Sequence, residues 1–149
     1  MPMKPIPYFG SNSLFTIHYN LRRKGSKEKG TKTMTESIMF TKAKAFALRI
    51  VRLYKYLRNR KESVIAKQLL RSGTSIGANI AESRYAQSKS DFTAKLQIAL
   101  KEAAETQYWL ELLRDAALVK SDKAFTTLCD DCTELIKLLT SSVKTVKSK

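Results

Sequence analysis

Two residue patterns in this sequence could support chemistry, a Cys-x-x-Cys pair and a set of glutamates, but neither is complete. Cys129 and Cys132 have the spacing of a redox pair or of half a zinc site. A zinc site needs two further Cys or His ligands, and a thioredoxin-type pair needs a strand that leads into a helix. The sequence offers neither, so we interpret both thiols as small residues in or near a helical core.

The glutamates are Glu82, Glu102 and Glu105, of which the last two share one helix face. A di-iron helix bundle also uses Glu-x-x-His pairs, whereas the only histidine of this chain is His18, in a different segment. We therefore predict no metal, no cofactor and no enzymatic activity. Buried carboxylates still need polar partners, because an unpaired buried charge is costly. The candidate partners are Arg71, Arg84, Lys101 and the amide of Asn79.

Small residues surround Gly73 and Gly77. A phosphate-binding loop would end in Gly-Lys-Ser/Thr and lie between a strand and a helix, and this stretch does neither. Glycine inside a helix costs about 1 kcal/mol relative to alanine, which close packing can offset. The stretch therefore predicts a close helix contact, either inside the subunit or between subunits.

A strong charge pattern lies between Lys42 and Lys61, a segment with eight Lys and Arg and no Asp or Glu. The whole chain has 28 Lys and Arg against 13 Asp and Glu, a formal charge of +15, which favours polyanions as partners. Two interpretations stay open: a solvated basic face, or a surface for phosphate backbone with Tyr54 and Tyr56 as candidate stacking residues. The cations assigned to a phosphate surface are Lys44, Arg49, Arg52, Lys55, Arg58, Arg60 and Lys61.

Helices must position these residues, because apolar residues recur every three or four positions from Met34 onward and no alternating run is long enough for a strand. The first helix is expected from about Glu36 to Leu57, the second from Ser63 to near Tyr85, the third from Ser88 or Ser90 to before Ala117, and the fourth from Ser121 or Asp122 through Val143. Thr35 and Ser63 are the expected caps of the first two. Helices of this length with short links predict an all-α, antiparallel up-down-up-down four-helix bundle.

One face of each helix should line the core. The predicted inward residues are Ala43, Phe46, Ala47, Ile50, Leu53, Tyr54 and Leu57; Ile65, Leu69, Gly73, Ile76 and Ile80; Phe92, Leu96, Ala99, Ala103, Thr106, Leu110 and Leu113; and Phe125, Leu128, Cys132, Leu135, Leu139 and Val143. Tyr108 and Trp109 stand beside the inward Leu110 and widen the apolar sector of the third helix. They indicate either an oligomer interface or a thicker monomer core.

The length of 149 residues suits one domain with an N-terminal extension. Residues 1–33 contain all three prolines and a basic run, so we interpret them as a flexible arm ahead of a bundle domain at 34–149. The arm is either a genuine extension or upstream sequence joined to a protein whose natural start is Met34. It holds seven Lys and Arg against one Glu, so +9 of the +15 belongs to residues 34–149.

We expect a cytoplasmic protein. No window has the roughly 18 uninterrupted apolar residues that a spanning helix requires, and the first residues lack a secretory signal. Two cysteines in a lysine-rich chain do not make a disulfide framework.

Three stretches resemble a known family: QLLRSGTSIGANIAE at 68–82, SKSDF at 88–92, and KLQIALKEAAET at 95–106. The sequence is similar to the bacterial four-helix bundle proteins that are encoded in intervening sequences of large-subunit ribosomal RNA genes, a family that includes accessory proteins of diversity-generating retroelements. The resemblance implies a basic bundle that forms a homopentameric ring and binds nucleic acid without known catalysis. In the retroelement branch it also implies contact with a reverse transcriptase.

The family pattern also singles out residues of this chain. It implies packing or polar-pairing roles for Asn79, Glu82, Phe92 and Glu105, beside Gly73 and Gly77. Ser83 departs from the pattern, because a glycine commonly follows the glutamate, and residues 1–33 have no counterpart in the family.

The sequence thus leads to a hypothesis and an alternative. The hypothesis is a non-enzymatic, oligomeric adaptor that holds RNA, DNA or an RNA–DNA hybrid by its phosphate backbone. The alternative is a protein-interaction module whose basic surface docks an acidic partner or a polymerase, without direct binding of nucleic acid.

Overall fold

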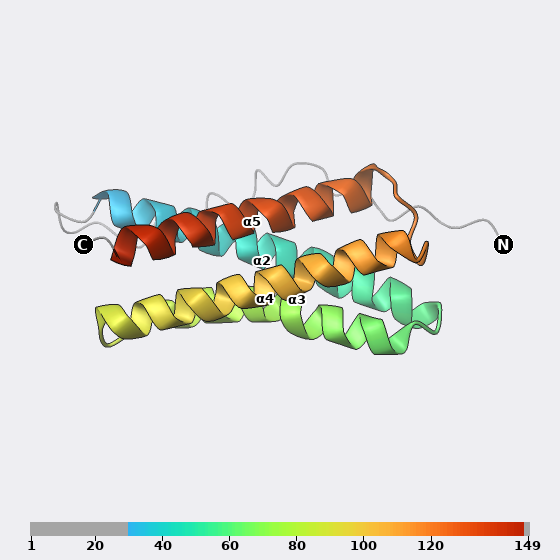
Figure 1. Ribbon diagram of the computed structural model, residues 1–149, viewed down its shortest axis with the longest axis horizontal. Coiled ribbons are helices and arrows are strands. Elements are labelled where there is room, and N and C mark those ends of the chain that lie inside the picture. The colour runs from blue at the N-terminus through green and yellow to red at the C-terminus, as the bar shows by residue number, and fades with distance from the viewer. Residues whose placement is uncertain (1–29, 148–149) are drawn as a thin grey trace, which may run out of the picture.

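The computed structural model describes residues 30–147, which form helices that run alternately up and down a bundle (Figure 1). The helices are α2 (Gly30–Asn59), α3 (Ser63–Ser83), α4 (Lys89–Asp115) and α5 (Lys123–Lys147). This part of the chain contains no strand, and the predicted all-α four-helix bundle is confirmed. Most of the predicted arm lies outside the described residues, and its last positions, 30–33, belong to the start of α2.

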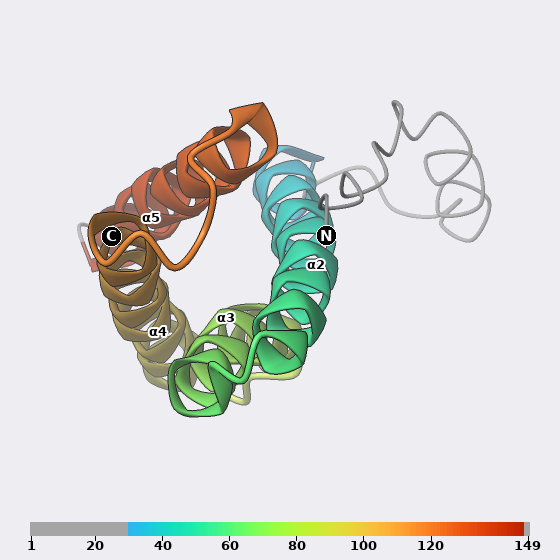
Figure 2. The same ribbon diagram turned by 90° about the vertical axis from the view of Figure 1, so that its right-hand side faces the viewer.

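The helices follow one another around a common core in chain order (Figure 2). Each helix contacts its neighbours in sequence, and α5 returns to contact α2. The contact between α3 and α4 is the most extensive and that between α2 and α5 the least. Within residues 30–147, the diagonal pairs α2–α4 and α3–α5 are not in contact, so these helices point their outer faces in opposite directions.

The helical periodicity correctly predicted most of the core. Of the predicted inward side chains, those buried are Ala43, Phe46, Ile50, Leu53, Leu57, Leu69, Ile76, Ile80, Leu96, Ala99, Ala103, Thr106, Leu110, Leu113, Phe125, Leu128, Cys132, Leu135, Leu139 and Val143. In the first turn of α3 the register differs from the prediction, because Ala66 takes the buried position and Ile65 is only half-buried. Ala47, Tyr54 and Phe92 are likewise half-buried.

Side chains cap the last two helices. The Ser88 hydroxyl accepts a hydrogen bond of 3.0 Å from the Asp91 N–H, and the Asp91 carboxylate accepts one of 3.1 Å from the Gln87 N–H. Asp122 accepts one of 2.9 Å from the Phe125 N–H. These bonds satisfy amides that a helix start leaves without partners, and they select Ser88 and Asp122 among the predicted caps.

The other predicted helix limits need correction. Thr35 lies inside α2, which begins at Gly30, so Thr35 does not cap that helix. Ser63 is already the first residue of α3, and Glu62 before it makes no side-chain cap bond. The helix also ends at Ser83, slightly earlier than predicted, because the turn into α4 begins there.

Both α2 and α4 end with a residue in the left-handed conformation that is not glycine. Lys61 has φ 66° and Ala117 has φ 53°. The Glu62 N–H donates to the Leu57 carbonyl at 3.0 Å, and the Leu118 N–H donates in the same way to the Leu113 carbonyl at 3.0 Å. This Schellman pattern satisfies carbonyls at each helix end, at a conformational cost of about 1 kcal/mol that glycine would avoid.

Helices α2 and α3 approach closely at Gly73. A Cβ atom built on Gly73 would lie 2.9 Å from both γ carbons of Ile50, which is too close for an unshifted contact. One turn later, a Cβ on Gly77 would lie 3.7 Å from the backbone of Ala43, an ordinary contact distance. Of the two alternatives left open by the sequence, Gly73 therefore serves packing inside the subunit.

The two glycines should respond in opposite ways to alanine. Gly73→Ala should lower the free energy of unfolding by about 1 kcal/mol or more, because overpacking costs about 1–3 kcal/mol and exceeds the gain in helix propensity. Gly77→Ala should raise it by up to about 1 kcal/mol, because the added methyl fits and glycine is a poor helix former. Urea unfolding followed by circular dichroism measures both, and a stabilised Gly73→Ala variant would contradict the close approach.

Candidate nucleic-acid interface

The basic segment of α2 is split between two sides of the helix. Its core stripe includes Ala43, Ile50 and Leu57, so cations on either flank of that stripe meet different surroundings. Lys42 and Arg49, seven positions apart, lie on the flank that faces α5. The others point outward or lie at the end of the helix.

Arg49 is held by α5 through three hydrogen bonds. One terminal nitrogen of its guanidinium donates to the Asp131 carboxylate, and the other donates to the Ala124 carbonyl at 2.6 Å and to the Thr127 hydroxyl at 2.9 Å. Its side chain is 29% exposed. Because both terminal nitrogens are engaged within the chain, Arg49 is better suited to joining α2 to α5 than to binding a phosphate.

Lys42 makes a second link of the same kind. Its ammonium nitrogen lies 2.9 Å from a carboxylate oxygen of Glu134. The two ion pairs lie along the α2–α5 contact, the least extensive helix contact of the bundle. These ion pairs therefore add polar links to the apolar packing between the two helices.

The outward side of α2 carries Lys44, Arg52 and Lys55, all exposed. Their spacing places them on one stripe, together with Leu48, whose side chain is 52% exposed. This stripe is on the side of α2 away from the core. A large ligand that lay along this side of the helix would meet all three exposed cations.

The end of α2 adds Arg58, Arg60 and Lys61, which are also exposed. The guanidinium of Arg58 lies 5.8 Å from the ring centre of Tyr54, and that of Arg60 lies 5.6 Å from the ring centre of Tyr56. Arg60 also donates to the Tyr56 hydroxyl at 3.1 Å. Both rings are half-buried against the core, which makes them poor platforms for stacking a base.

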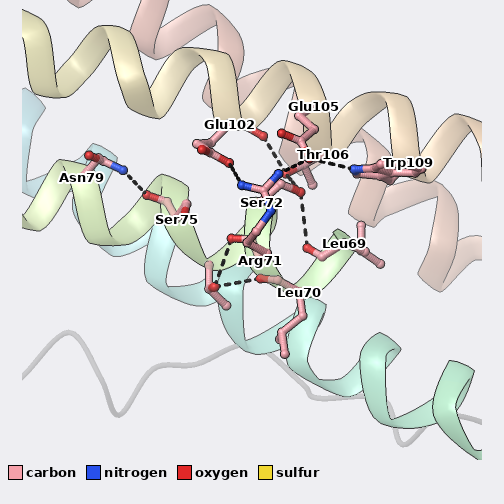
Figure 3. A network of polar contacts seen from close by, with 11 residues as sticks. Leu69, Leu70, Arg71, Ser72, Ser75, Asn79, Glu102, Glu105, Thr106 and Trp109 are labelled. Atoms are coloured by element: carbon pink, nitrogen blue, oxygen red, sulfur yellow. Dashed lines mark hydrogen bonds and ion pairs between the residues drawn. The ribbon is translucent and has the colours of Figure 1, made fainter. Parts of the chain in front are cut away.

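The family motif forms a polar network between α3 and α4 (Figure 3). The Arg71 guanidinium donates to the Glu105 carboxylate and lies 3.5 Å from a carboxylate oxygen of Glu102. The Trp109 indole N–H donates to the same Glu105 carboxylate at 3.1 Å. The hydrogen bond from Arg71 and then that from Trp109 lower the pKa of Glu105 below its ordinary value of 4.5.

A buried hydroxyl pair lies behind this network. The Thr106 hydroxyl is 2.9 Å from the Ser72 hydroxyl and donates to the Glu102 carbonyl at 2.7 Å, and both side chains are fully buried. Buried polar groups that have partners fix the relative position of the elements that carry them. Ser72 and Thr106 thus set the register of α3 against α4, a role that sequence reasoning missed for Ser72.

The predicted carboxylate partners are only partly correct. Arg71 contacts Glu102 and Glu105 as predicted, but the Asn79 amide donates to the Ser75 carbonyl of its own helix at 2.9 Å. Arg84 lies over the ring of Phe40, 4.5 Å from its centre.

The remaining motif positions lie toward the turn between α3 and α4. Glu82 pairs with Lys95 at 2.5 Å. Phe92 packs partly against the core. Ser83, the departure from the family pattern, is buried and donates to the Ile80 carbonyl at 2.8 Å, so its hydroxyl is satisfied.

The two cysteines are core or near-core residues, as the sequence predicted. Cys132 is fully buried, with its Sγ 3.5 Å from the Ala103 carbonyl oxygen, and burial raises its thiol pKa to about 12. Cys129 is half-buried, and burial raises its pKa as well. Such thiols stay protonated at neutral pH and are weak nucleophiles. Among residues 30–147, no three His, Cys, Asp or Glu side chains gather as a metal site would require.

Sequence reasoning also missed the α5 partners of α2. Thr127, Asp131 and Glu134 lie on neighbouring turns of α5, opposite Arg49 and Lys42. The sequence did contain a usable signal for ion pairs between these helices. The last helix carries acids one turn apart, and the first carries cations two turns apart. Pairing them required knowing that these two helices are adjacent.

Comparison with known proteins identifies the family. The sequence pattern of the 23S rRNA-intervening sequence protein family matches residues 35–141. This chain belongs to that family. The match covers most of the bundle and confirms the resemblance seen in the sequence.

A solved structure supports the same fold. It is the crystal structure of a protein of unknown function from the S23 ribosomal protein family of Bacteroides thetaiotaomicron. It is 50% identical to this chain, covers 74% of this chain and 98% of its own, and superposes with a TM-score of 0.70. No curated protein matches. Within residues 30–147, none of the helices has the length and apolar character needed to cross a membrane.

The motif carboxylate should make stability depend on pH. Because Arg71 and Trp109 hold the pKa of Glu105 below its ordinary value, the pair stabilises the fold above that value and loses its effect as the pH falls through the folded pKa. Glu105→Gln keeps the shape but loses the charge. It should lower the melting temperature at pH 7, and the difference from the unaltered chain should shrink as the pH falls below the ordinary glutamate pKa of 4.5. A difference that stays constant as the pH falls would show that the ion pair is not responsible.

Comparing alanine variants of Arg49 and Lys55 should distinguish a loss of stability from a mere loss of surface charge. Arg49→Ala should lower the free energy of unfolding by about 1–2 kcal/mol, because it removes charged hydrogen bonds that are partly screened by solvent. Lys55→Ala removes the same charge from an exposed position and should change the free energy of unfolding by no more than about 0.5 kcal/mol. Urea unfolding of both variants tests this, and equal effects would argue against the role of Arg49 in joining α2 to α5.

Proposed function

We propose that this chain is a non-enzymatic protein that binds RNA, DNA or an RNA–DNA hybrid by its phosphate backbone along α2. The observation that carries the proposal is a set of exposed cations without an intervening acid. We call it the α2 cation row, and it consists of Lys44, Arg52, Lys55, Arg58, Arg60 and Lys61. Arg49 is left out, because α5 already engages it.

The geometry of the row suits an extended polyanion. From Lys44 to Arg58 it runs for about 20 Å along a continuous helix, a length over which one strand of a duplex presents roughly six phosphates. The charge of the rest of the chain is also positive, so attraction acts at long range and guides association.

Backbone binding of this kind should carry little sequence information. Lysine and arginine contacts to phosphate fix position on the nucleic acid, whereas base edges must be contacted for sequence to be read. Tyr54 and Tyr56 are half-buried beside Arg58 and Arg60, which argues against base stacking on them. We therefore expect weak preference among sequences.

The family supports a nucleic-acid context without specifying the ligand. It is named for an intervening sequence of 23S rRNA, and the crystal structure similar to this chain carries a ribosomal family name but no known function. A chain with this fold and a row of exposed cations is consistent with a role beside nucleic acid.

A second candidate function is favoured by Leu48. This side chain is 52% exposed between Lys44 and Arg52, where phosphate would gain nothing from it. An apolar residue among cations suits an acidic protein partner, such as a polymerase or a reverse transcriptase, that docks on the same surface.

Charge reversal tests the binding proposal. Lys44→Glu, Arg52→Glu and Lys55→Glu together should weaken binding of a fluorescent 20-base-pair RNA more than tenfold at low salt. They should also reduce the slope of log affinity against log salt by about 2–3, because roughly 0.9 is lost for each phosphate contact. Fluorescence anisotropy at several salt concentrations measures both quantities.

A matched control keeps the change in net charge the same. Lys123→Glu, Lys137→Glu and Lys144→Glu alter exposed lysines of α5 by an equal amount and should weaken binding much less. Equal loss in both triple variants would mean that net charge, not the α2 cation row, binds the ligand. The second candidate would be favoured by two results together. The unaltered chain would not bind the RNA, and a protein partner would co-purify with it after nuclease treatment but not with the Leu48→Ser variant.

A further inference from the structure

The turn between α3 and α4 lies at the end of the bundle where α2 begins (Figure 1), and a hollow opens there. Its volume is about 390 Å³, within the roughly 300–1,000 Å³ that small-molecule sites occupy. Three helices or their ends form its wall, which includes Glu36 of α2, Ser83 and Arg84 at the end of α3, and Ser88, Lys89 and Phe92 at the start of α4. The hollow is large enough for a group the size of one sugar phosphate.

The cation in this wall is held in place by an aromatic ring. The guanidinium of Arg84 lies over the ring of Phe40, 4.5 Å from its centre. A cation in this position is attracted by the electrons of the ring. Phe40 itself packs against the core from α2. The position of Arg84 at the hollow is therefore set by a second helix.

The hollow has an excess of positive charge. Two cations line it, Arg84 and the exposed Lys89, against the single carboxylate of Glu36. The nearby Asp91 carboxylate already accepts a hydrogen bond of 3.1 Å from the Gln87 N–H, as part of the turn. The rest of the chain is positive as well, so an anion is the favoured ligand of this hollow.

An exposed aromatic ring stands beside the hollow. Tyr85 is 87% exposed and lies in the chain between Arg84 and Ala86, both of which line the hollow. Tyr54 and Tyr56, in contrast, are half-buried against the core. Proteins that bind single-stranded nucleic acid combine cations for the backbone with exposed aromatic rings on which bases stack. The turn between α3 and α4 has both components.

The hollow also continues the α2 cation row. Phe40 lies one turn before Lys44 on α2, and Lys44 is the first member of the row. Because Arg84 is held over Phe40, it extends the line of cations from α2 onto the end of α3. A strand that follows the row toward the start of α2 would therefore reach the hollow.

We propose that the turn between α3 and α4 binds an unpaired nucleotide, with its base stacked on Tyr85 and its sugar phosphate in the hollow beside Arg84 and Lys89. A base inside a duplex has both faces covered by its neighbours, so only an unpaired base can stack on the ring. The site thus selects single-stranded segments, whereas the α2 cation row holds a backbone whether or not its bases are paired. The inference rests on the proposed function for the class of ligand, and a single strand tests it separately.

Binding of a short single strand tests the proposal on the full chain. The probe is a fluorescent RNA of about eight nucleotides without self-complementarity, measured by fluorescence anisotropy at low salt. Tyr85→Ala should weaken its binding about fivefold or more, because one stacked base is lost, whereas Tyr85→Phe keeps the ring and should stay within about twofold. Lys89→Ala should reduce the slope of log affinity against log salt by about 0.7, the value for one phosphate of a single strand.

A second exposed tyrosine provides the matched control. Tyr108 of α4 is 57% exposed and does not line the hollow, so Tyr108→Ala should keep the affinity for the single strand. The affinity for a blunt RNA duplex should also be the same in Tyr85→Ala as in the unaltered chain. Tyr85 is exposed at a turn, and melting followed by circular dichroism confirms that each variant compared is folded.

Three results would overturn the proposal: no binding of the single strand by the unaltered chain, an unchanged affinity in Tyr85→Ala, or an equal loss in Tyr85→Ala and Tyr108→Ala. A chain that binds the blunt duplex but not the single strand would overturn this inference alone and leave the α2 cation row in place. Binding of the single strand that is lost only in Tyr85→Ala would support the inference even for a chain that does not bind the duplex.

Discussion

The close approach of α3 to α2 at Gly73 determines which side of α2 faces water. Ile50 occupies the space that a side chain on Gly73 would need, so the two helices meet in one rotational setting. On its other flank, α2 is held by Asp131 and Glu134 of α5. With the core stripe turned inward and both flanks occupied, the remaining side of α2 is the one that carries Lys44, Arg52 and Lys55. The surface chemistry of this helix is therefore a consequence of how it packs.

The bundle is joined by two different kinds of interaction. Between α3 and α4 the contact is extensive and includes the buried Ser72–Thr106 hydrogen bond, which is shielded from salt. Between α2 and α5 the contact is small and includes ion pairs with side chains 29–49% exposed, which salt screens. Of these two contacts, the one between α2 and α5 is therefore expected to be the more sensitive to ionic strength.

Apolar periodicity and local chemistry predict much of this structure. They do not predict which side chains of different helices contact each other. Burial follows the apolar repeat, so Leu69, Ile76 and Ile80 were found inside as predicted, and Ser88 and Asp122 cap helices because an unpaired amide needs an acceptor nearby. The start of α3 was misassigned because Ile65 is the larger apolar residue, whereas the geometry of the turn places the smaller Ala66 inward.

The candidate site was harder to predict than the fold. A run of cations in sequence contains no information about which of them another helix will engage, and Arg49 is bound by residues of α5 that are distant in the chain. The sequence predicts that the Asn79 amide donates to a carboxylate, whereas in the structure it donates to the Ser75 carbonyl one turn back in its own helix. In both cases the residue type indicates that the side chain needs a polar partner. It does not indicate which residue that partner is.

The indole of Trp109 gives the molecule an internal optical probe. It is the only tryptophan in the chain, and it lies on α4 with its N–H bonded to Glu105 and its ring against Tyr108. Tryptophan emission therefore originates from one face of the bundle, diagonally opposite the α2 cation row. We expect a ligand that binds along α2 to leave this fluorescence largely unchanged, and a contact near Tyr108 on α4 to change its wavelength or intensity. Intrinsic fluorescence would thus distinguish these two sides of the bundle without a label.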